Sequence, residues 1–382
     1  MDNPFVYGEI VPPAAFANRV GELHRLVDDL DACQKIFLIS PRRYGKSSLI
    51  RRALAVMARR GALTIDVTVA SFSSYVAFLE GYSRAILAAE SKSDRARSWL
   101  LEAIRSARPE LRYDPDASSL TPAALSVSFP TVRSDRDVER LAQEVFALPG
   151  RLAEARQRKV MVALDEFQAI GGFDGGSVEH AMRAAVQQQR TVGYVFAGSE
   201  PSLMEQMLTP KRPFYKAGPV MRLERIPGEE FADFLEARFT KSGIKPEAGL
   251  GAAIVELAGN LPYDVQRLAH ETWDEVRREA RRRATLDDLH SALKRLLSEQ
   301  QTMFEAFWQR LTLPQRSVLR AVALEGRELL SADTRTRHRL GGPSSVQTAL
   351  SALVRDDVIR REEQRYVVVD SLLREWVVRK TF

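Results

Sequence analysis

The stretch Lys35-Ile36-Phe37-Leu38-Ile39-Ser40-Pro41-Arg42-Arg43-Tyr44-Gly45-Lys46-Ser47-Ser48-Leu49-Ile50 decides the fold. A short apolar run leads into turn-forming residues and then into helix-forming residues, a pattern that predicts a strand, a loop and a helix. Gly45-Lys46-Ser47 ends the motif G-x-x-x-x-G-K-[ST], whose backbone N–H groups cradle phosphates while its lysine and hydroxyl reach the outer phosphates and magnesium. We therefore expect residues 40–48 to bind a nucleotide, with Lys46 also catalytic and Ser47 on magnesium.

Ser40 departs from this motif, because it stands where a glycine normally lets the chain turn tightly. The alternative to a phosphate loop is an ordinary turn with a solvated lysine. The chain has only ten lysines against 46 arginines, so a lysine between glycine and serine after an apolar strand is a rare chance event. We therefore favour the phosphate loop.

A second apolar run, Val160 to Leu164, ends in the acidic pair Asp165-Glu166. A nucleotide-hydrolysing enzyme needs one carboxylate for magnesium and a second group that orients the attacking water. Asp165 is the candidate magnesium ligand and Glu166 the candidate general base. The alternative is a strand that ends in two exposed acids.

Apolar runs of strand length alternate with segments of helix length through the first 227 residues. This alternation predicts an α/β fold, a P-loop NTPase core with a parallel sheet and helices on both faces. An insertion at about 71–150 contains a helical stretch, 75–107, and a Pro/Ser/Asp-rich loop or hairpin, 109–134. The expected strands, beside the one at 35–39, are 63–69, 160–164, 193–197 and 220–223, and a helix is expected at 19–32.

The strand pattern stops after Pro227, and residues 228–300 predict an all-helical lid with helices at 229–241, 250–258, 263–283 and 286–300. Residues 301–382 show three helices and then two short β-type runs joined by a charged turn. Three helices with a two-stranded wing predict a winged helix-turn-helix. The final helix carries Trp376, which we expect in the core.

Two further side chains are candidates for catalysis. Ser199 follows the strand 193–197 and is a candidate sensor of the γ-phosphate; equally, it could cap the helix that follows. Arg212 could act in trans as an arginine finger, since such a side chain stabilises charge on the transferring phosphoryl group. A surface arginine is the alternative for Arg212.

Composition bounds the environment of the protein. A single cysteine, Cys33, excludes an intrachain disulfide and a cysteine-clustered zinc site, and no metal-binding spacing involves the histidines. No apolar stretch is long enough to span a membrane and the N-terminus has no leader pattern, so we expect a cytoplasmic protein without membrane contact. The net charge of +6 permits contact with nucleic acid.

In these motifs the chain resembles the AAA+ superfamily, and within it the prokaryotic and archaeal-type STAND-like ATPases. The resemblance runs nearly end to end. It is carried by Asn18-Arg19-Glu22, residues 40–49, Leu164-Asp165-Glu166-Phe167-Gln168, Ala197-Gly198-Ser199, Pro213-Phe214-Tyr215 and Gly259-Asn260-Leu261-Pro262-Tyr263. It implies that ATP and Mg²⁺ are bound, that the nucleotide state sets the angle between lid and core, and that Phe16, Arg19 and Pro262 border the adenine.

The C-terminal module leaves its partner open. Its expected recognition helix, 344–355, is polar but carries no basic residue before Arg355. Binding of double-stranded DNA would place this helix in the major groove with arginines on phosphates. The alternatives are a protein partner, self-association or an autoinhibitory contact. The basic side chains before the helix and in the wing are Arg335, Arg337, Arg339, Arg360, Arg361 and Arg365.

Three functions remain open at this point. The first is a Mg²⁺-dependent ATPase that acts as a conformational switch, with the winged helix as effector or regulatory module. The second is an ATP-dependent DNA-binding protein of the origin-recognition or loader type. The third is a scaffold that holds nucleotide without hydrolysing it, and the intact Asp165-Glu166 pair argues against that.

Overall fold

The computed structural model describes residues 2–8, 19–89, 99, 103–104, 109–113, 125–173, 177–362 and 364–380. Two compact units make up the chain. One is Arg19–Glu224, and the other combines Met1–Asn18 with Arg225–Phe382. None of the described helices is both long and apolar enough to cross a membrane.

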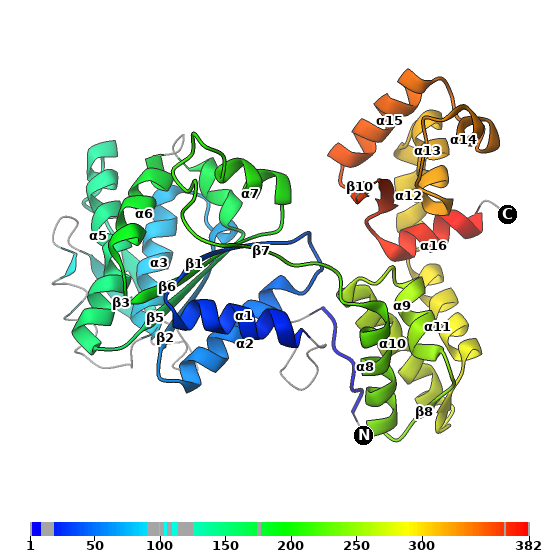
Figure 1. The fold of residues 1–382 in the computed structure, drawn as a ribbon, viewed down its shortest axis with the longest axis horizontal. Coiled ribbons are helices and arrows are strands. Elements are labelled where there is room, and N and C mark those ends of the chain that lie inside the picture. The colour runs from blue at the N-terminus through cyan, green and yellow to red at the C-terminus, as the bar shows by residue number, and fades with distance from the viewer. Residues whose placement is uncertain are drawn as a thin grey trace. The chain divides into compact units, whose positions relative to one another are not determined.

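The first unit is built on a five-stranded parallel sheet, as the sequence predicts (Figure 1). The strand order is β2-β5-β6-β1-β7, so the chain leaves β1, crosses to the far edge and returns strand by strand. The three central strands, β5, β6 and β1, are buried on both faces, which is why they appear in the sequence as continuous apolar runs. Their bounds are β1 Lys35–Ile39, β2 Leu63–Thr68, β5 Val160–Asp165, β6 Val192–Gly198 and β7 Val220–Arg222.

Helices cover both faces of this sheet (Figure 1). On one face lie α1 (Val20–Asp31) and α2 (Lys46–Arg59). On the other lie α3 (Tyr75–Ala89), α5 (Asp135–Arg156) and α6 (Ser177–Gln188), whose apolar sides join alternate strand residues such as Val162 and Tyr194 in one core. A short helix, α7 (Pro201–Met207), follows β6.

The insertion between β2 and β5 contains a β-hairpin, one of the two alternatives, loop or hairpin, that the sequence left open for residues 109–134. Strands β3 (Glu110–Tyr113) and β4 (Leu125–Ser128) pair antiparallel. Helix α3 is described up to Ala89, and most of the rest of the helical stretch predicted at 75–107 lies outside the described residues. Helix α5 begins with a reciprocal capping box between Ser134 and Asp137.

The second unit begins with four helices: α8 (Gly228–Lys241), α9 (Leu250–Leu257), α10 (Pro262–Arg278) and α11 (Leu286–Glu299). The expectation that strands stop after Pro227 is wrong, because β8 (Lys245–Pro246) pairs in parallel with β9 (Arg283–Ala284). Helix α10 also ends five residues earlier than predicted, where Ala280 takes a left-handed φ of 53° and frees the chain for β9. Strands of two residues are too short to show an alternating pattern.

Residues 2–8 pack within this second unit, although the sequence grouped 1–227 as one core. The Phe5 side chain is only 1% exposed and its ring contacts that of Phe239, 4.7 Å between centroids. The Arg238 guanidinium donates hydrogen bonds to the carbonyl of Pro4. The N-terminal residues therefore help to complete the core formed by α8 and α10.

The C-terminal part has the winged helix that the sequence predicts. Strands β10 and β11 pair antiparallel as the wing, and the ring of the buried Trp376 contacts those of Phe304 and Trp308, as expected for a core residue. The elements are α12 Gln301–Arg310, α13 Leu313–Leu324, α14 Ala332–Arg337, α15 Pro343–Arg355, β10 Ile359–Glu362, β11 Arg365–Val368 and α16 Ser371–Lys380.

Candidate nucleotide-binding site

The loop 40–45 joins the end of β1 to the first turn of α2, as the motif requires. Within the loop, Arg43 and Gly45 have left-handed φ values of 69° and 82°. Ser40 does not, and its N–H donates to the Gly198 carbonyl on β6. Glycine's conformational freedom is therefore needed at Gly45 and not at position 40, which explains why serine is tolerated there.

Lys46, Ser47 and the acidic pair meet across the sheet. The Lys46 Nζ atom lies 2.8 Å from Asp165 Oδ1 and 3.2 Å from Glu166 Oε1, and its side chain is only 6% exposed. The Ser47 hydroxyl donates to Asp165 Oδ2 at 2.6 Å. This meeting follows from strand order, since β1 and β5 flank β6 and parallel strands end at one edge.

The same cluster offers the oxygen ligands that magnesium prefers. The Ser47 hydroxyl and the Asp165 carboxylate lie side by side next to the N-terminus of α2, where backbone N–H groups favour anions such as phosphates. These residues therefore fit a magnesium ion bound together with a nucleotide.

Glu166 occupies a constrained position at the end of β5. Its φ of 52° is left-handed, which is unfavourable for a residue with a side chain. Ser199 Oγ donates to Glu166 Oε2 at 2.5 Å, and Gln168 Nε2 donates to the same oxygen at 2.7 Å. Burial raises the pKa of Glu166, but these two hydrogen bonds and the charge of Lys46 outweigh it, so the pKa lies below its ordinary value.

Ser199 therefore contacts the candidate general base. The alternative that Ser199 caps the next helix is wrong, because Glu200 occupies the N-cap position of α7 and its side chain makes no capping hydrogen bond. Glu200 instead lies 3.8 Å from the exposed guanidinium of Arg42 in the phosphate loop.

Arg19 supports the phosphate loop from within the first unit. Its buried guanidinium donates to the carbonyls of Tyr44 and Glu224 at 3.0 and 2.7 Å, and it pairs with Glu22 at 2.7 Å. These bonds tie α1 to the loop and to the chain that follows β7. Contact between Arg19 and the base stays a prediction. Of its proposed companions, Phe16 lies outside the described residues and Pro262 begins α10 in the other unit.

Arg212, the candidate arginine finger, pairs with Glu179 of α6. Glu179 is fully buried, and burial raises its pKa against the opposing charge of Arg212. A second contact, from Arg183 Nε to the Pro213 carbonyl at 3.2 Å, holds the same loop on α6. Action in trans would require Arg212 to leave a buried carboxylate, which is costly.

Sequence reasoning missed the roles of Gln168 and Glu179. Gln168 was noted only as part of the acidic motif, and its proximity to Glu166 and Ser199 depends on the turn after β5. Glu179 lies 33 residues from Arg212, and no spacing rule connects two such positions. The one signal in the sequence was the uninterrupted run Asp165-Glu166-Phe167-Gln168.

Acidic neighbours already neutralise several basic side chains of the winged helix. Arg337 pairs with Glu325 and Asp333, and Arg360 pairs with Glu362. Arg361 and Arg365 of the wing and Arg339 before α15 are exposed. The outer side of α15 presents Ser344, Gln347 and Thr348.

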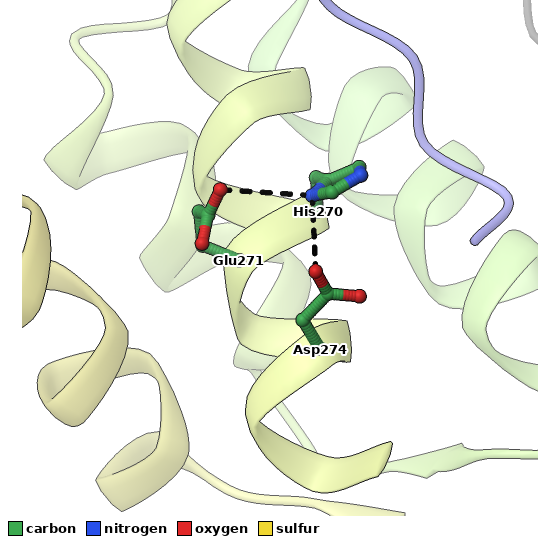
Figure 2. Close-up of side chains that lie close together, drawn as sticks. All are labelled: His270, Glu271 and Asp274. Carbon is green, nitrogen blue, oxygen red and sulfur yellow. Dashed lines mark ion pairs between the residues drawn. The ribbon is translucent and has the colours of Figure 1, made fainter. Parts of the chain in front are cut away.

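One group in the second unit combines a histidine with two carboxylates. Figure 2 shows His270 Nδ1 facing Glu271 and Asp274 on α10, 3.7 Å from a carboxylate oxygen of each. Both carboxylates accept other hydrogen bonds, Glu271 from Tyr7 at 3.0 Å and Asp274 from Asn3 at 2.8 Å. The group thus ties the N-terminal residues to α10, and we interpret His270 as a packing residue.

Comparison with known proteins agrees with this architecture. Residues 302–379 match the family model of a probable winged helix domain. No curated protein sequence matches the chain.

Solved structures with the same fold have low sequence identity. A Walker-type ATPase of Pyrococcus abyssi is 16% identical, with 98% of this chain and 99% of that chain covered and a TM-score of 0.62. The Aeropyrum pernix ORC2 protein, in ADPNP–ADP complexes, is 12% identical over 99% and 96%, with a TM-score of 0.56. The Aeropyrum pernix ORC1 protein in complex with DNA is 14% identical over 100% and 98%, with a TM-score of 0.51. The chain therefore has the fold of an AAA+ ATPase with a C-terminal winged helix.

Proposed function

We propose that this protein is a Mg²⁺-dependent ATPase of the AAA+ class that works as a nucleotide-driven conformational switch. The single observation that carries the proposal is the cluster of Lys46, Ser47, Asp165 and Glu166 at one edge of the sheet. A nearly buried lysine, a hydroxyl and two carboxylates lie together beside a helix N-terminus, where phosphates and their magnesium ion are favoured.

Each residue of the cluster has a distinct role in this proposal. Residues 40–48 bind the phosphates through the loop and the start of α2, and Lys46 pairs with the outer phosphates. Mg²⁺, held by Ser47 and Asp165, supplies positive charge that offsets the charge of the phosphates. Glu166, kept ionised by its hydrogen bonds, takes a proton from the attacking water. Ser199 contacts this base and senses the γ-phosphate.

The finer features of the proposal follow the STAND-like resemblance. ATP binding closes the helical lid, residues 228–300, over the core, residues 19–224, and hydrolysis reopens it. The winged helix, residues 301–382, transmits this change to a partner or restrains it. Phe16, Arg19 and Pro262 contact the base. Arg212 would act in trans only in an assembled form in which it leaves the carboxylate of Glu179.

Replacement of the general base tests the proposal most directly. Glu166→Gln keeps the size of the side chain and its hydrogen-bonding reach but cannot accept the proton. We expect ATP to bind with about the wild-type affinity while kcat falls by about 10²–10⁴-fold. Wild-type turnover in this variant, measured as phosphate release with Mg²⁺, would reject hydrolysis by Glu166. Tight binding without turnover by the wild-type protein would favour the scaffold instead.

A second candidate function is ATP-dependent binding of double-stranded DNA. The winged helix favours it, together with the similarity to an ORC1 protein solved in complex with DNA. In this case the protein binds duplex DNA at low salt, and the logarithm of the binding constant falls linearly with the logarithm of the salt concentration. The reason is that each phosphate contact releases counterions. Fluorescence anisotropy with a labelled duplex, with and without ATP, measures both effects. Absence of binding at low salt in both nucleotide states would exclude it.

A further inference from the structure

Gln168 lies on a short, firmly anchored segment next to the general base. It belongs to η4 (Phe167–Gly172), the 3-10 helix that follows β5. The fully buried ring of Phe167 packs against Phe196 and Phe214, with centroids 4.7 and 5.3 Å away. The Ala169 N–H also donates to the Glu166 carbonyl. Packing and backbone bonding therefore fix where the Gln168 side chain begins.

The two oxygens of the Glu166 carboxylate have different surroundings. Oε2 accepts hydrogen bonds from Gln168 Nε2 at 2.7 Å and from Ser199 Oγ at 2.5 Å. Oε1 faces only Lys46 Nζ among these groups, at 3.2 Å. Because a carboxylate only accepts hydrogen bonds, the direction of the Gln168 bond is unambiguous. When phosphates draw Lys46 away, Oε1 is the oxygen left free.

Two features indicate that Gln168 is not present for stability. Its Oε1 atom is buried and makes no hydrogen bond with any described residue, an arrangement that lowers stability. Gly198 on β6 also leaves room for it, since a Cβ atom there would lie 2.7 Å from Gln168 Oε1. A leucine would fill the same space without an unpaired acceptor.

We propose that Gln168 is a positioning residue for catalysis: with Ser199 it holds Oε2 of Glu166, so that Oε1 is the oxygen that accepts the proton from water. In this step the water oxygen bonds to the γ-phosphorus, its proton passes to Glu166 Oε1, and the bond from the γ-phosphorus to ADP breaks with its electron pair leaving on ADP. The inference rests on the proposed ATPase activity and adds to it the residue that orients the base.

The test compares Gln168→Leu with Gln187→Leu, the same change at an exposed glutamine on α6. We expect Gln168→Leu to lower kcat about tenfold or more, while the Kd for ADP stays within about threefold, because the bond orients the base without touching the nucleotide. Gln187→Leu retains wild-type kcat. Thermal unfolding monitors folding, and if Gln168→Leu does not fold, Gln168→Met takes its place.

A double-mutant cycle separates positioning from a merely structural role. If Gln168 acts through Glu166, Gln168→Leu adds no further loss of kcat in the Glu166→Gln background. The inference is overturned if Gln168→Leu keeps the wild-type kcat, or if the two losses of kcat multiply in the double variant. Neither result affects the proposed ATPase activity. A wild-type protein without ATP turnover overturns the proposed function as well, so the two failures are distinguishable.

Discussion

The nucleotide-binding cluster and the winged helix both contain many charged side chains, but they use them differently. In the cluster, Lys46 and Asp165 lie 119 residues apart and converge below the protein surface. In the winged helix, Arg337 pairs with Asp333 one helical turn away, and Arg360 pairs with Glu362 two residues away. The cluster brings a lysine, a hydroxyl and two carboxylates together beside a helix N-terminus, which indicates a site, whereas these pairs in the winged helix neutralise its surface. A count of basic residues alone would have favoured the winged helix over the cluster as the candidate site.

Among the variants that test this comparison, removal of Lys46 should have the largest effect, a loss of nucleotide affinity. In Lys46→Ala, two adjacent carboxylates lose their common cation, and the phosphates lose theirs. Truncation of one partner of a buried charge pair costs about 2–5 kcal/mol, so we expect nucleotide affinity to fall by about 30–5,000-fold. Isothermal titration with ATP and Mg²⁺ measures the loss.

Lys211→Ala is the matched control, since Lys211 is an exposed lysine of the same unit. We expect its affinity for ATP to equal that of the wild type. If both variants bind ATP with wild-type affinity, Lys46 does not contact the phosphates and the converging cluster is structural.

Replacement of Gly198 should have the next largest effect, because this glycine leaves space for Met204 of α7 and for the side chain of Gln168. A Cβ atom at this position would lie 2.2 Å from Met204 Cγ, so Gly198→Ala forces the surroundings to shift. Overpacking of this kind costs about 1–3 kcal/mol of stability. We expect kcat to fall about tenfold as well, since the end of β6 carries Ser199.

Gly172→Ala provides the comparison at the end of η4, where an added Cβ would meet no atom within 4 Å. Chemical denaturation and steady-state kinetics are measured for both variants. Equal effects at the two glycines would show that the close packing around Gly198 does not matter for the site.

The sequence predicts the parts of the site that lie within one motif. Lys46, Ser47, Asp165 and Glu166 were found because a phosphate loop and an acid-ended strand each need adjacent residues. The sheet followed from apolar runs, since parallel strands buried on both faces leave that pattern. Strand order then brought the two motifs together.

Other features depend on the tertiary structure and were out of reach. Two-residue strands such as β8 leave no periodicity, and the pairing of Arg212 with Glu179 joins two positions that no spacing relates. The role of Ser199 was left open between sensor and helix cap. That choice depends on where α7 begins, and element boundaries are the least certain feature of a sequence.

A smaller effect is expected at Arg225, which contacts both the wing and the turn at Gly259 between α9 and α10. Arg225 pairs with Glu362 of β10 at 2.8 Å and donates to the Gly259 carbonyl, so one guanidinium ties two parts of the second unit. Burial raises the pKa of Glu362, but hydrogen bonding from Arg225 and the charges of Arg360 and Arg225 outweigh it. The folded-state pKa therefore lies below the ordinary value of 4.5.

A lowered carboxylate pKa sets the direction of the pH effect. The contribution of Glu362 is fully present above its unfolded pKa and disappears as the pH falls through its folded pKa. Glu362→Gln should thus lower stability by about 1 kcal/mol at pH 7 and by less near pH 3. Urea unfolding at both pH values checks this, with Glu328→Gln as an exposed control. The same loss at both values would mean that the charge of Glu362 is not involved.

The smallest effect is expected on the exposed arginines of the wing. If duplex DNA binds, the double change Arg361→Ala and Arg365→Ala should lower the affinity for DNA a few-fold. It should also reduce the slope of log affinity against log salt concentration by about one unit for each phosphate contact that is lost. Arg337→Ala should change affinity less, because Glu325 and Asp333 already neutralise that side chain. Anisotropy titrations over a range of salt concentrations distinguish the two variants. An equal loss of affinity in both would mean that DNA displaces the acidic partners of Arg337, and local pairing would then not mark a surface as inactive.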